Sequence, residues 1–254
     1  MIDIHSHILP YIDDGPQTIE EAIAMAKAAL YEGITKIIAT PHHKNGSYRN
    51  PKSHIVERVT EFNKALMERG IPLTVLAGQE TRIHGDILKD YEDGELLTLA
   101  ESGYVFIELP SNHVPRYTEQ LLYDMQVKGL FPIIVHPERN GEIIENPELL
   151  YQFVKKGALT QTTAASVCGL FGKKIKKFAL EAIGANLTHF IASDAHNTKN
   201  RSFHLRDAYE VIKKEFGREQ VYVFQENAEL VVDGKTIYRD VPERIKKKKF
   251  LGIF

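Results

Sequence analysis

Several features that define other protein classes are scarce or missing in this sequence. It contains one cysteine, Cys168, among 254 residues, so no disulfide can form within the chain. It has no apolar run of membrane-spanning length, and its start, Met1–His7, lacks the apolar stretch of a signal peptide. The formal net charge of −2 gives no sign of the strong basicity of most nucleic-acid-binding proteins. These absences predict a cytoplasmic protein with no transmembrane segment and no nucleic acid as a structural partner.

What the sequence does contain is a regular alternation of helices and short apolar strands. Most of the predicted helices stop at a glycine, which adopts the left-handed conformation at a helix end without strain. The strands are apolar on both faces, which is typical of a parallel sheet covered by helices. We expect strands at residues 2–7, 36–42, 72–80, 104–110, 131–137, 158–163 and 187–194, and helices at residues 18–31, 52–69, 84–95, 118–128, 147–156, 172–183 and 203–216.

No proline- or serine-rich linker interrupts this alternation. We therefore predict a single domain over residues 1–254, with a basic tail from about residue 242. Repeated strand–helix units fit either a closed barrel or an open doubly wound sheet. The positions of the polar residues favour the barrel.

Histidine and acidic residues follow six of the seven predicted strands at the point where each strand ends. The first strand ends in His5 and His7, which point to the same face of an extended chain. In parallel strand–helix barrels, the active site forms at the carboxyl ends of the strands. The candidates are His5, His7, Asp14 with its neighbour Asp13, His42, Glu80, Glu108, His136, Asp194 and His196.

This mixture of imidazoles and carboxylates indicates a site for several divalent ions. Carboxylates can bridge ions and balance their charge, while neutral imidazoles fill the remaining positions. The candidates are too numerous for one tetrahedral zinc ion. Taken one at a time, each has a structural alternative: a strand-end histidine can be a buried core residue, and Asp194 can cap the next helix. His43 is a candidate for orienting a ligand.

The motifs that carry these residues resemble the polymerase and histidinol phosphatase (PHP) family over nearly the whole chain. They are His5-x-His7, Ile12-Asp13-Asp14-Gly15, Thr40-Pro41-His42, Glu80, Glu108, His136-Pro137-Glu138-Arg139 and Ser193-Asp194-Ala195-His196. The opening and the His136–Arg139 segment are similar to manganese-dependent protein-tyrosine phosphatases of Gram-positive bacteria, which act in capsule and exopolysaccharide control.

The resemblance implies a distorted seven-stranded (β/α)7 TIM-like barrel, the PHP fold, holding three divalent ions. Manganese is the implied metal, with iron, zinc or cobalt as alternatives. The first ion would be held by His5, His7, Glu80 and Asp194; Glu80 would bridge to a second ion held also by Glu108 and His136; Asp14, His42 and His196 would hold the third. The implied substrate is phosphotyrosine in proteins, especially a membrane-associated tyrosine autokinase.

The expected reaction is hydrolysis by a hydroxide that bridges the metals and attacks phosphorus in line. Arg139 is the first candidate for holding the phosphoryl oxygens through its planar fork, and Arg206 is the second. Each has an alternative: Arg139 can pair with Glu138 or Glu142, and Arg206 can lie on the charged outer face of its helix.

Two other mechanisms of phosphate chemistry are not supported. A thiol phosphatase needs Cys-x5-Arg, but Lys174 stands six positions after Cys168, and no Gly-x4-Gly-Lys-[Ser/Thr] loop is present. Within the same fold, a small-molecule phosphatase such as histidinol-phosphate phosphatase is an alternative function. A non-catalytic metal-binding scaffold is another. The basic tail is either a solvated end or a contact with a membrane-proximal kinase or anionic lipid.

Overall fold

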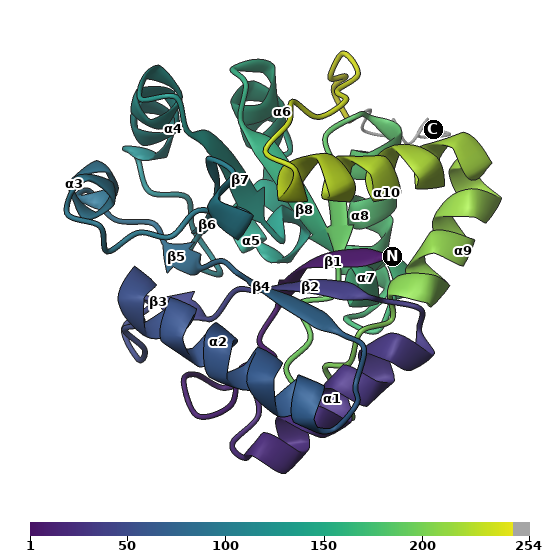
Figure 1. Cartoon of the computed structure of the whole chain (residues 1–254). Coiled ribbons are helices and arrows are strands. Elements are labelled where there is room, and N and C mark those ends of the chain that lie inside the picture. Colours follow the sequence, from purple (N-terminus) through teal and green to yellow (C-terminus); the bar gives the residue numbers. More distant parts are fainter. Residues whose placement is uncertain (246–254) are drawn as a thin grey trace, which may run out of the picture.

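Parallel strands form the core of the structure, a computed structural model that describes residues 1–245 (Figure 1). The strands pair in two sheets, in the orders β1-β2-β4 and β3-β5-β6-β7-β8-β9. Their bounds are β1 Ile2–Ser6, β2 Lys36–Ala39, β3 His42–His43, β4 Thr74–Ala77, β5 Glu80–Arg82, β6 Tyr104–Glu108, β7 Phe131–Val135, β8 Leu159–Thr163 and β9 Phe190–Ala192.

Two of the expected strands are each interrupted once, which joins the two sheets. β2 continues into β3 after Pro41, and β4 continues into β5 after Gly78. Pairing resumes across both interruptions, since the Gly78 amide donates to Ala39 O at 2.9 Å and the Glu80 amide donates to Pro41 O at 3.0 Å. Glycine is required at position 78 because a Cβ there would lie 2.6 Å from a methyl carbon of Ile38.

The last strand returns to the first and closes the ring of strands. Ser6 and Ala195 form a parallel bridge. The Asp194 amide donates to His5 O at 2.9 Å, and the His7 amide donates to Ala195 O at 2.8 Å. With each interrupted strand counted once, the barrel has seven strands, so the expected distorted (β/α)7 barrel is confirmed.

Helices cover the outside of the barrel close to the expected positions. Thr18 caps the first helix by accepting a hydrogen bond from the Glu21 amide at 3.1 Å, as its sequence position predicts. The expected helices are α1 Ile19–Tyr31, α2 Lys52–Glu68, α3 Ile87–Glu92, α4 Thr118–Val127, α6 Glu148–Lys155, α8 Lys173–Gly184 and α9 Leu205–Phe216.

Several helical segments were not expected. They are α5 Gly141–Glu145, α7 Ala164–Cys168, α10 Arg218–Val232 and the single turns η1 Leu99–Glu101 and η2 Pro137–Arg139. The longest, α10, places Ala228 and Val231 in the same apolar cluster as Ile4 and Phe106 from inside the barrel. It therefore fills the amino-terminal end of the barrel, beside the N-terminus (Figure 1).

No helix within residues 1–245 is long and apolar enough to cross a membrane. The tail expected from about residue 242 lies mostly outside the described residues. At its start, the Arg244 side chain pairs with Glu148 at 3.0 Å. The single domain over residues 1–254 stays a prediction.

Candidate metal centre

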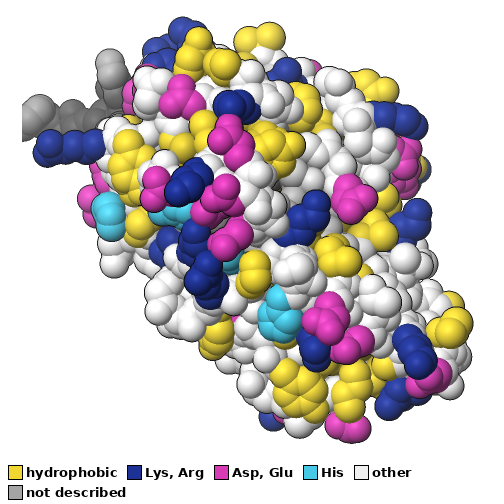
Figure 2. Space-filling view, turned by 60° about the vertical axis from the view of Figure 1, so that its left-hand side comes forward, with side chains coloured by type: hydrophobic (Ala, Val, Ile, Leu, Met, Phe, Trp, Pro, Cys, Tyr) yellow, Lys and Arg dark blue, Asp and Glu magenta, His cyan; other side chains and the backbone are white. Residues whose placement is uncertain are grey.

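The expected metal ligands come together at the carboxyl end of the barrel. They come from β1 and the loop after it (His5, His7, Asp14), β3 (His42), β5 (Glu80), β6 (Glu108), the residue after β7 (His136) and the segment after β9 (Asp194, His196). Figure 2 shows histidine side chains reaching the surface among acidic and basic side chains on one face. The ligand atoms fall into three overlapping groups.

The first group is centred on the two histidines of the first strand. The Nε2 atoms of His5 and His7 lie 3.6 and 3.3 Å from Glu80 Oε2. The same atoms lie 3.5 and 3.3 Å from Asp194 Oδ1. Two imidazole nitrogens and two carboxylate oxygens, from three different parts of the chain, thus face one point.

The second group lies around Asp14, in the loop after β1. Asp14 Oδ1 is 3.4 Å from His42 Nε2 and 3.3 Å from His196 Nε2. The side chain of Asp14 is half-exposed, whereas that of His196 is buried. This group is therefore the one that opens most toward solvent.

The third group is reached through Glu80, which has no solvent exposure. Its Oε1 lies 2.8 Å from His136 Nε2, and its Oε2 lies 2.8 Å from His42 Nδ1. Glu108 Oε2 lies 3.8 Å from the same His42 nitrogen. The two oxygens of Glu80 face different histidines, which is the arrangement a bridging carboxylate needs.

Several polar atoms in this cluster are buried and have no hydrogen-bond partner. Buried polar atoms are nearly always paired, so a group of unpaired ones needs a physical explanation. Divalent ions provide it, because every one of these atoms is a nitrogen or oxygen that can donate a lone pair to a metal. The unpaired atoms are His5 Nε2, His7 Nε2, His42 Nδ1, Glu80 Oε2, Glu108 Oε2 and His196 Nε2. His42 Nδ1 and Glu80 Oε2 lie 2.8 Å apart but do not have the geometry of a hydrogen bond.

Hydrogen bonds on the opposite side of the rings orient three of these histidines. His5 Nδ1 donates to Gln161 Oε1 at 2.8 Å, and His7 Nδ1 donates to Asp13 Oδ2 at 2.7 Å. His196 Nδ1 donates to the backbone oxygen of Asp194 at 2.9 Å. These bonds place the proton on Nδ1 and leave the Nε2 lone pair free, the usual arrangement of metal-binding histidines. Gln161 was missed from the sequence, although a glutamine in a buried strand was a visible signal.

The backbone is strained at two of the strand ends. His136 has φ 37° and Asp194 has φ 53°, both in the left-handed region. Side chains other than glycine rarely adopt this region, and such strain gathers at functional sites. The left-handed turn ends each strand and lets the side chain point into the cluster.

The charges of the cluster shift the titration of its carboxyl groups. Burial alone would raise the pKa of Glu80, but the neighbouring His42 and His5 hold it well below its usual range. Burial, followed by the charge of Glu80, raises the pKa of Glu108 to about 7. Two carboxylates this close need added positive charge if both are to be ionised at neutral pH.

Three arginines border the cluster, and one of them, Arg82, donates to Glu108 Oε1 at 3.0 Å. Arg139 donates to Asp194 Oδ2 at 2.5 Å, and it is the arginine expected from the sequence. Arg201 was missed: its guanidinium lies 3.1 Å from Asp194 Oδ2 and 3.4 Å from Asp14 Oδ2. The alternative pairing of Arg139 with Glu138 or Glu142 is not formed, since Arg139 pairs with Asp194. Glu138 accepts hydrogen bonds from Thr163 N and Ser166 Oγ, and Glu142 accepts one from the Val114 amide.

The expectation for Arg206 needs correction. Its side chain donates to the backbone oxygen of Tyr31 at the end of α1, and it lies over the Tyr31 ring at 5.6 Å. This position is next to Gly33, which pairs with the chain's first residue at the opposite end of β1. Arg206 therefore lies beside the end of α1 and away from the cluster.

His43 also lies outside the cluster. It belongs to a separate group with Asp90 and Glu95, and neither of its ring nitrogens has a hydrogen-bond partner. The expectation that it orients a metal ligand finds no support in these contacts.

Known proteins resemble the chain over its whole length. Residues 1–233 match the family described as capsular polysaccharide synthesis, CpsB/CapC. The tyrosine-protein phosphatase YwqE of Bacillus subtilis is 52% identical over 254 residues, which is 100% of both chains. The putative tyrosine-protein phosphatase CapC of Staphylococcus aureus is 41% identical, again over 100% of both chains.

The fold agrees with a crystal structure from work on YwqE of Bacillus subtilis and CpsB of Streptococcus pneumoniae, described as metal-dependent tyrosine phosphatases. That structure covers 97% of this chain and 100% of its own, with a TM-score of 0.95 and 52% identity. An organophosphorus hydrolase from Deinococcus radiodurans shares the fold alone, with a TM-score of 0.55 and 16% identity over 91% of each chain. The chain belongs to the CpsB/CapC family of capsular polysaccharide synthesis.

Proposed function

We propose that this protein hydrolyses phosphotyrosine in other proteins and uses divalent ions held at the carboxyl end of its barrel. Family membership and the phosphatase relatives support the activity. The observation that carries the metal centre is the set of buried, unpaired imidazole and carboxylate atoms that face one another. Such atoms are costly to bury without a cation.

The donor set fits three ions. His5, His7, Glu80 and Asp194 would hold the first, Glu80 with Glu108 and His136 the second, and Asp14, His42 and His196 the third. All donors are nitrogen or oxygen, which suits manganese, with iron, zinc or cobalt as alternatives. Bound divalent ions supply positive charge for the phosphoryl oxygens and activate water at neutral pH.

The arginines hold the substrate in this proposal. Arg139 and Arg201 both reach Asp194 Oδ2 from different elements, so their guanidinium groups stand at the same edge of the cluster. Each presents several N–H donors in a plane, which matches the oxygens of a phosphoryl group. The tyrosine leaving group has a pKa of about 10, so it needs less protonation than an alkyl oxygen would.

We propose phosphotyrosine proteins as partners, with a membrane-associated tyrosine autokinase as the main substrate. The family's role in capsular polysaccharide synthesis supports this assignment. A cytoplasmic location belongs to the same proposal and is supported by the single cysteine.

Metal content and activity on a phosphotyrosine peptide test the proposal together. In the purified protein we expect more than one ion per chain and hydrolysis that a chelator abolishes. Glu80→Gln should lose both bound metal and activity, because the amide cannot bridge two cations. Glu57→Gln, at an exposed position on α2, is the matched control and should retain both.

The same assay decides between the alternatives. Faster turnover of histidinol phosphate than of the peptide would favour a small-molecule phosphatase. Fewer than two ions per chain together with no turnover would favour a scaffold. Equal activity in wild type and Glu80→Gln would refute the bridging role of Glu80.

A further inference from the structure

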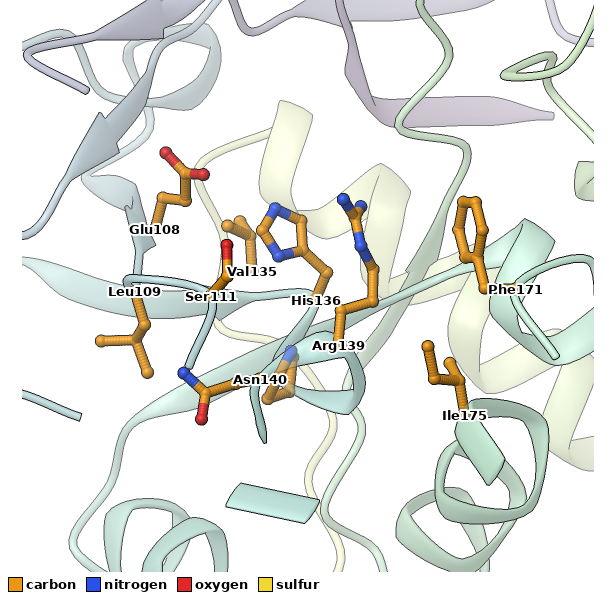
Figure 3. Close-up of a pocket in the computed structure, with 10 residues that line it drawn as sticks. Glu108, Leu109, Ser111, Val135, His136, Arg139, Asn140, Phe171 and Ile175 are labelled. Carbon is orange, nitrogen blue, oxygen red and sulfur yellow. The ribbon is translucent and has the colours of Figure 1, made fainter. Parts of the chain in front are cut away.

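A pocket of about 280 Å³ adjoins the metal centre on the side of Glu108 and His136. Figure 3 shows the His136 ring beside the Arg139 side chain, with Phe171 beyond Arg139 and Ile175 below Phe171. Residues from the ends of β6 and β7 line one side, and Phe171 and Ile175, between α7 and the first turn of α8, line the other. If metal ions hold a phosphoryl group, the substituent of that group can therefore enter this pocket.

The two ends of the pocket differ in chemistry. Glu108, His136 and Arg139 form the end next to the metal centre. Phe171 and Ile175 contribute apolar surface on the far side of Arg139, whereas Leu109 lies beside Glu108 (Figure 3). A ligand that fills the pocket needs an anionic end and an apolar end.

Asn140 also lines the pocket, but its polar atoms are already used. Its amide nitrogen donates to Pro110 O at 2.7 Å and to His113 O at 3.2 Å. Its side-chain oxygen accepts from the Ile143 amide at 2.9 Å. Asn140 thus fixes the shape of the pocket wall and adds no free polar group to it.

Arg139 connects the two ends. Its guanidinium donates to Asp194, one of the proposed metal ligands, and its central carbon lies 5.2 Å from the centroid of the Phe171 ring. That distance is within the range of a cation–π contact. A phosphoryl group held by Arg139 would therefore have its substituent next to the Phe171 ring.

The pocket on the opposite side of the metal centre has a different lining. It has a similar volume, about 280 Å³, and is bordered by Asp14 and His196. It is lined by Pro16, Ala24 and Met25 as well as by Gln17, Asn197 and Lys199. It has no phenylalanine or tyrosine side chain that could stack on a substrate ring, whereas the first pocket has Phe171.

We propose that the part of the pocket formed by Phe171 and Ile175 binds the aromatic ring of the substrate phosphotyrosine. Phe171 is then a residue that determines specificity for aryl over alkyl phosphate monoesters. Aromatic rings pack favourably against one another and against aliphatic side chains. The inference rests on the proposed function, since it places the leaving group of that reaction.

Binding of non-hydrolysable analogues to the metal-loaded enzyme tests the pocket without turnover. The probes are phenylphosphonate, which carries a ring, and methylphosphonate, which does not. Phe171→Ala and Ile175→Ala should each weaken phenylphosphonate binding by about 10-fold. Both should leave methylphosphonate binding within about 2-fold. Leu170→Ala, at an exposed neighbouring position outside the pocket, is the control and should change neither.

Phe171→Ala could act through Arg139, because the two side chains are in contact. Ile175→Ala is therefore the second, independent test of the apolar part of the pocket. Equal weakening of both analogues by Phe171→Ala, with no effect of Ile175→Ala, would mean that Phe171 only positions Arg139, and it would overturn the proposal. Unchanged phenylphosphonate binding in both variants would overturn it as well.

Kinetics separate this inference from the proposed function. The two variants should reduce kcat/KM for phenyl phosphate by about 10-fold, mainly through KM, and should leave ethyl phosphate unchanged. If the wild type binds phenylphosphonate in a Phe171-dependent manner but hydrolyses no phosphotyrosine peptide, the proposed function fails while the pocket stands. If the wild type hydrolyses the peptide and the variants do not discriminate between the esters, only the pocket fails.

Discussion

Replacing Asp13 with asparagine should weaken metal binding although Asp13 is not among the proposed ligands. The buried carboxylate of Asp13 accepts three hydrogen bonds. His7 Nδ1 donates to Oδ2 at 2.7 Å, and the His42 amide donates to the same oxygen at 3.1 Å. The Gly15 amide donates to Oδ1 at 2.9 Å. One side chain thus orients the His7 ring and positions the backbone of His42.

Asparagine cannot accept all three bonds because it has one oxygen and one NH2 group. Whichever way the amide turns, at least one buried donor faces the NH2 group. An unsatisfied buried donor costs about 1–3 kcal/mol. Loss of the hydrogen bond that orients a ligand typically reduces metal affinity by about 10–100-fold. The two figures agree, since 10–100-fold corresponds to about 1.4–2.7 kcal/mol.

Titration with a competing chelator measures this effect. For Asp13→Asn, we expect loss of the most weakly held metal at a chelator concentration about 10–100-fold lower than for wild type. Added metal should restore much of the activity on an aryl phosphate. Asp124→Asn, at a partly exposed position on α4, removes a carboxylate elsewhere and should behave as wild type. A chelator midpoint for Asp13→Asn within about 2-fold of wild type would refute the reasoning.

Three further predictions concern other parts of the chain. Arg201→Ala should lower kcat/KM for an aryl phosphate by about 100-fold, while Arg206→Ala should leave it unchanged; similar losses in both would contradict the structure. Burial, followed by the charge of Arg239, lowers the pKa of His189 to about 3, so between pH 6.5 and 4.5 only the unfolded chain takes up this proton. In urea unfolding, the free energy of unfolding of wild type should then fall by about 2–3 kcal/mol more than that of His189→Gln over that interval. Equal decreases in the two proteins would contradict the lowered pKa of His189. Gly78→Ala should lower the free energy of unfolding by about 1–3 kcal/mol, because its Cβ would lie 2.6 Å from Ile38, whereas Gly85→Ala has nothing within 4 Å and should not.

The barrel could be predicted because its signals are local. Each apolar strand and the glycine after each helix can be read within a few residues of sequence. Parallel strands connected by helices bring their carboxyl ends to one side, so residues as distant as His5 and His196 could be expected to meet. The interruption of the third strand could not be predicted, since the crowding at Gly78 involves Ile38 and Leu99 from distant parts of the chain.

Helix α10 was missed for a different reason. Its buried residues Val221, Phe224, Ala228 and Val231 follow helical spacing, so the periodic signal was present. The simple alternation of strand and helix had no place for a second helix directly after Gly217. Its role depends on the open end of the barrel, which exists only in the folded chain.

The sequence predicted Arg206 beside the cluster, but the structure places Arg201 there, and a local turn explains the difference. The Asn197 side chain accepts hydrogen bonds from the backbone amides of Lys199, Asn200 and Arg201, and the amides of His196 and Asn197 both donate to Arg201 O. This tight turn returns Arg201 to the residue that ends the metal-binding motif, so its guanidinium reaches Asp14 and Asp194. Asparagine favours such turns because its side chain can replace a backbone acceptor. The path of this loop therefore determines which arginine lies beside the cluster. A prediction based on the helix at α9 selects Arg206, which lies elsewhere.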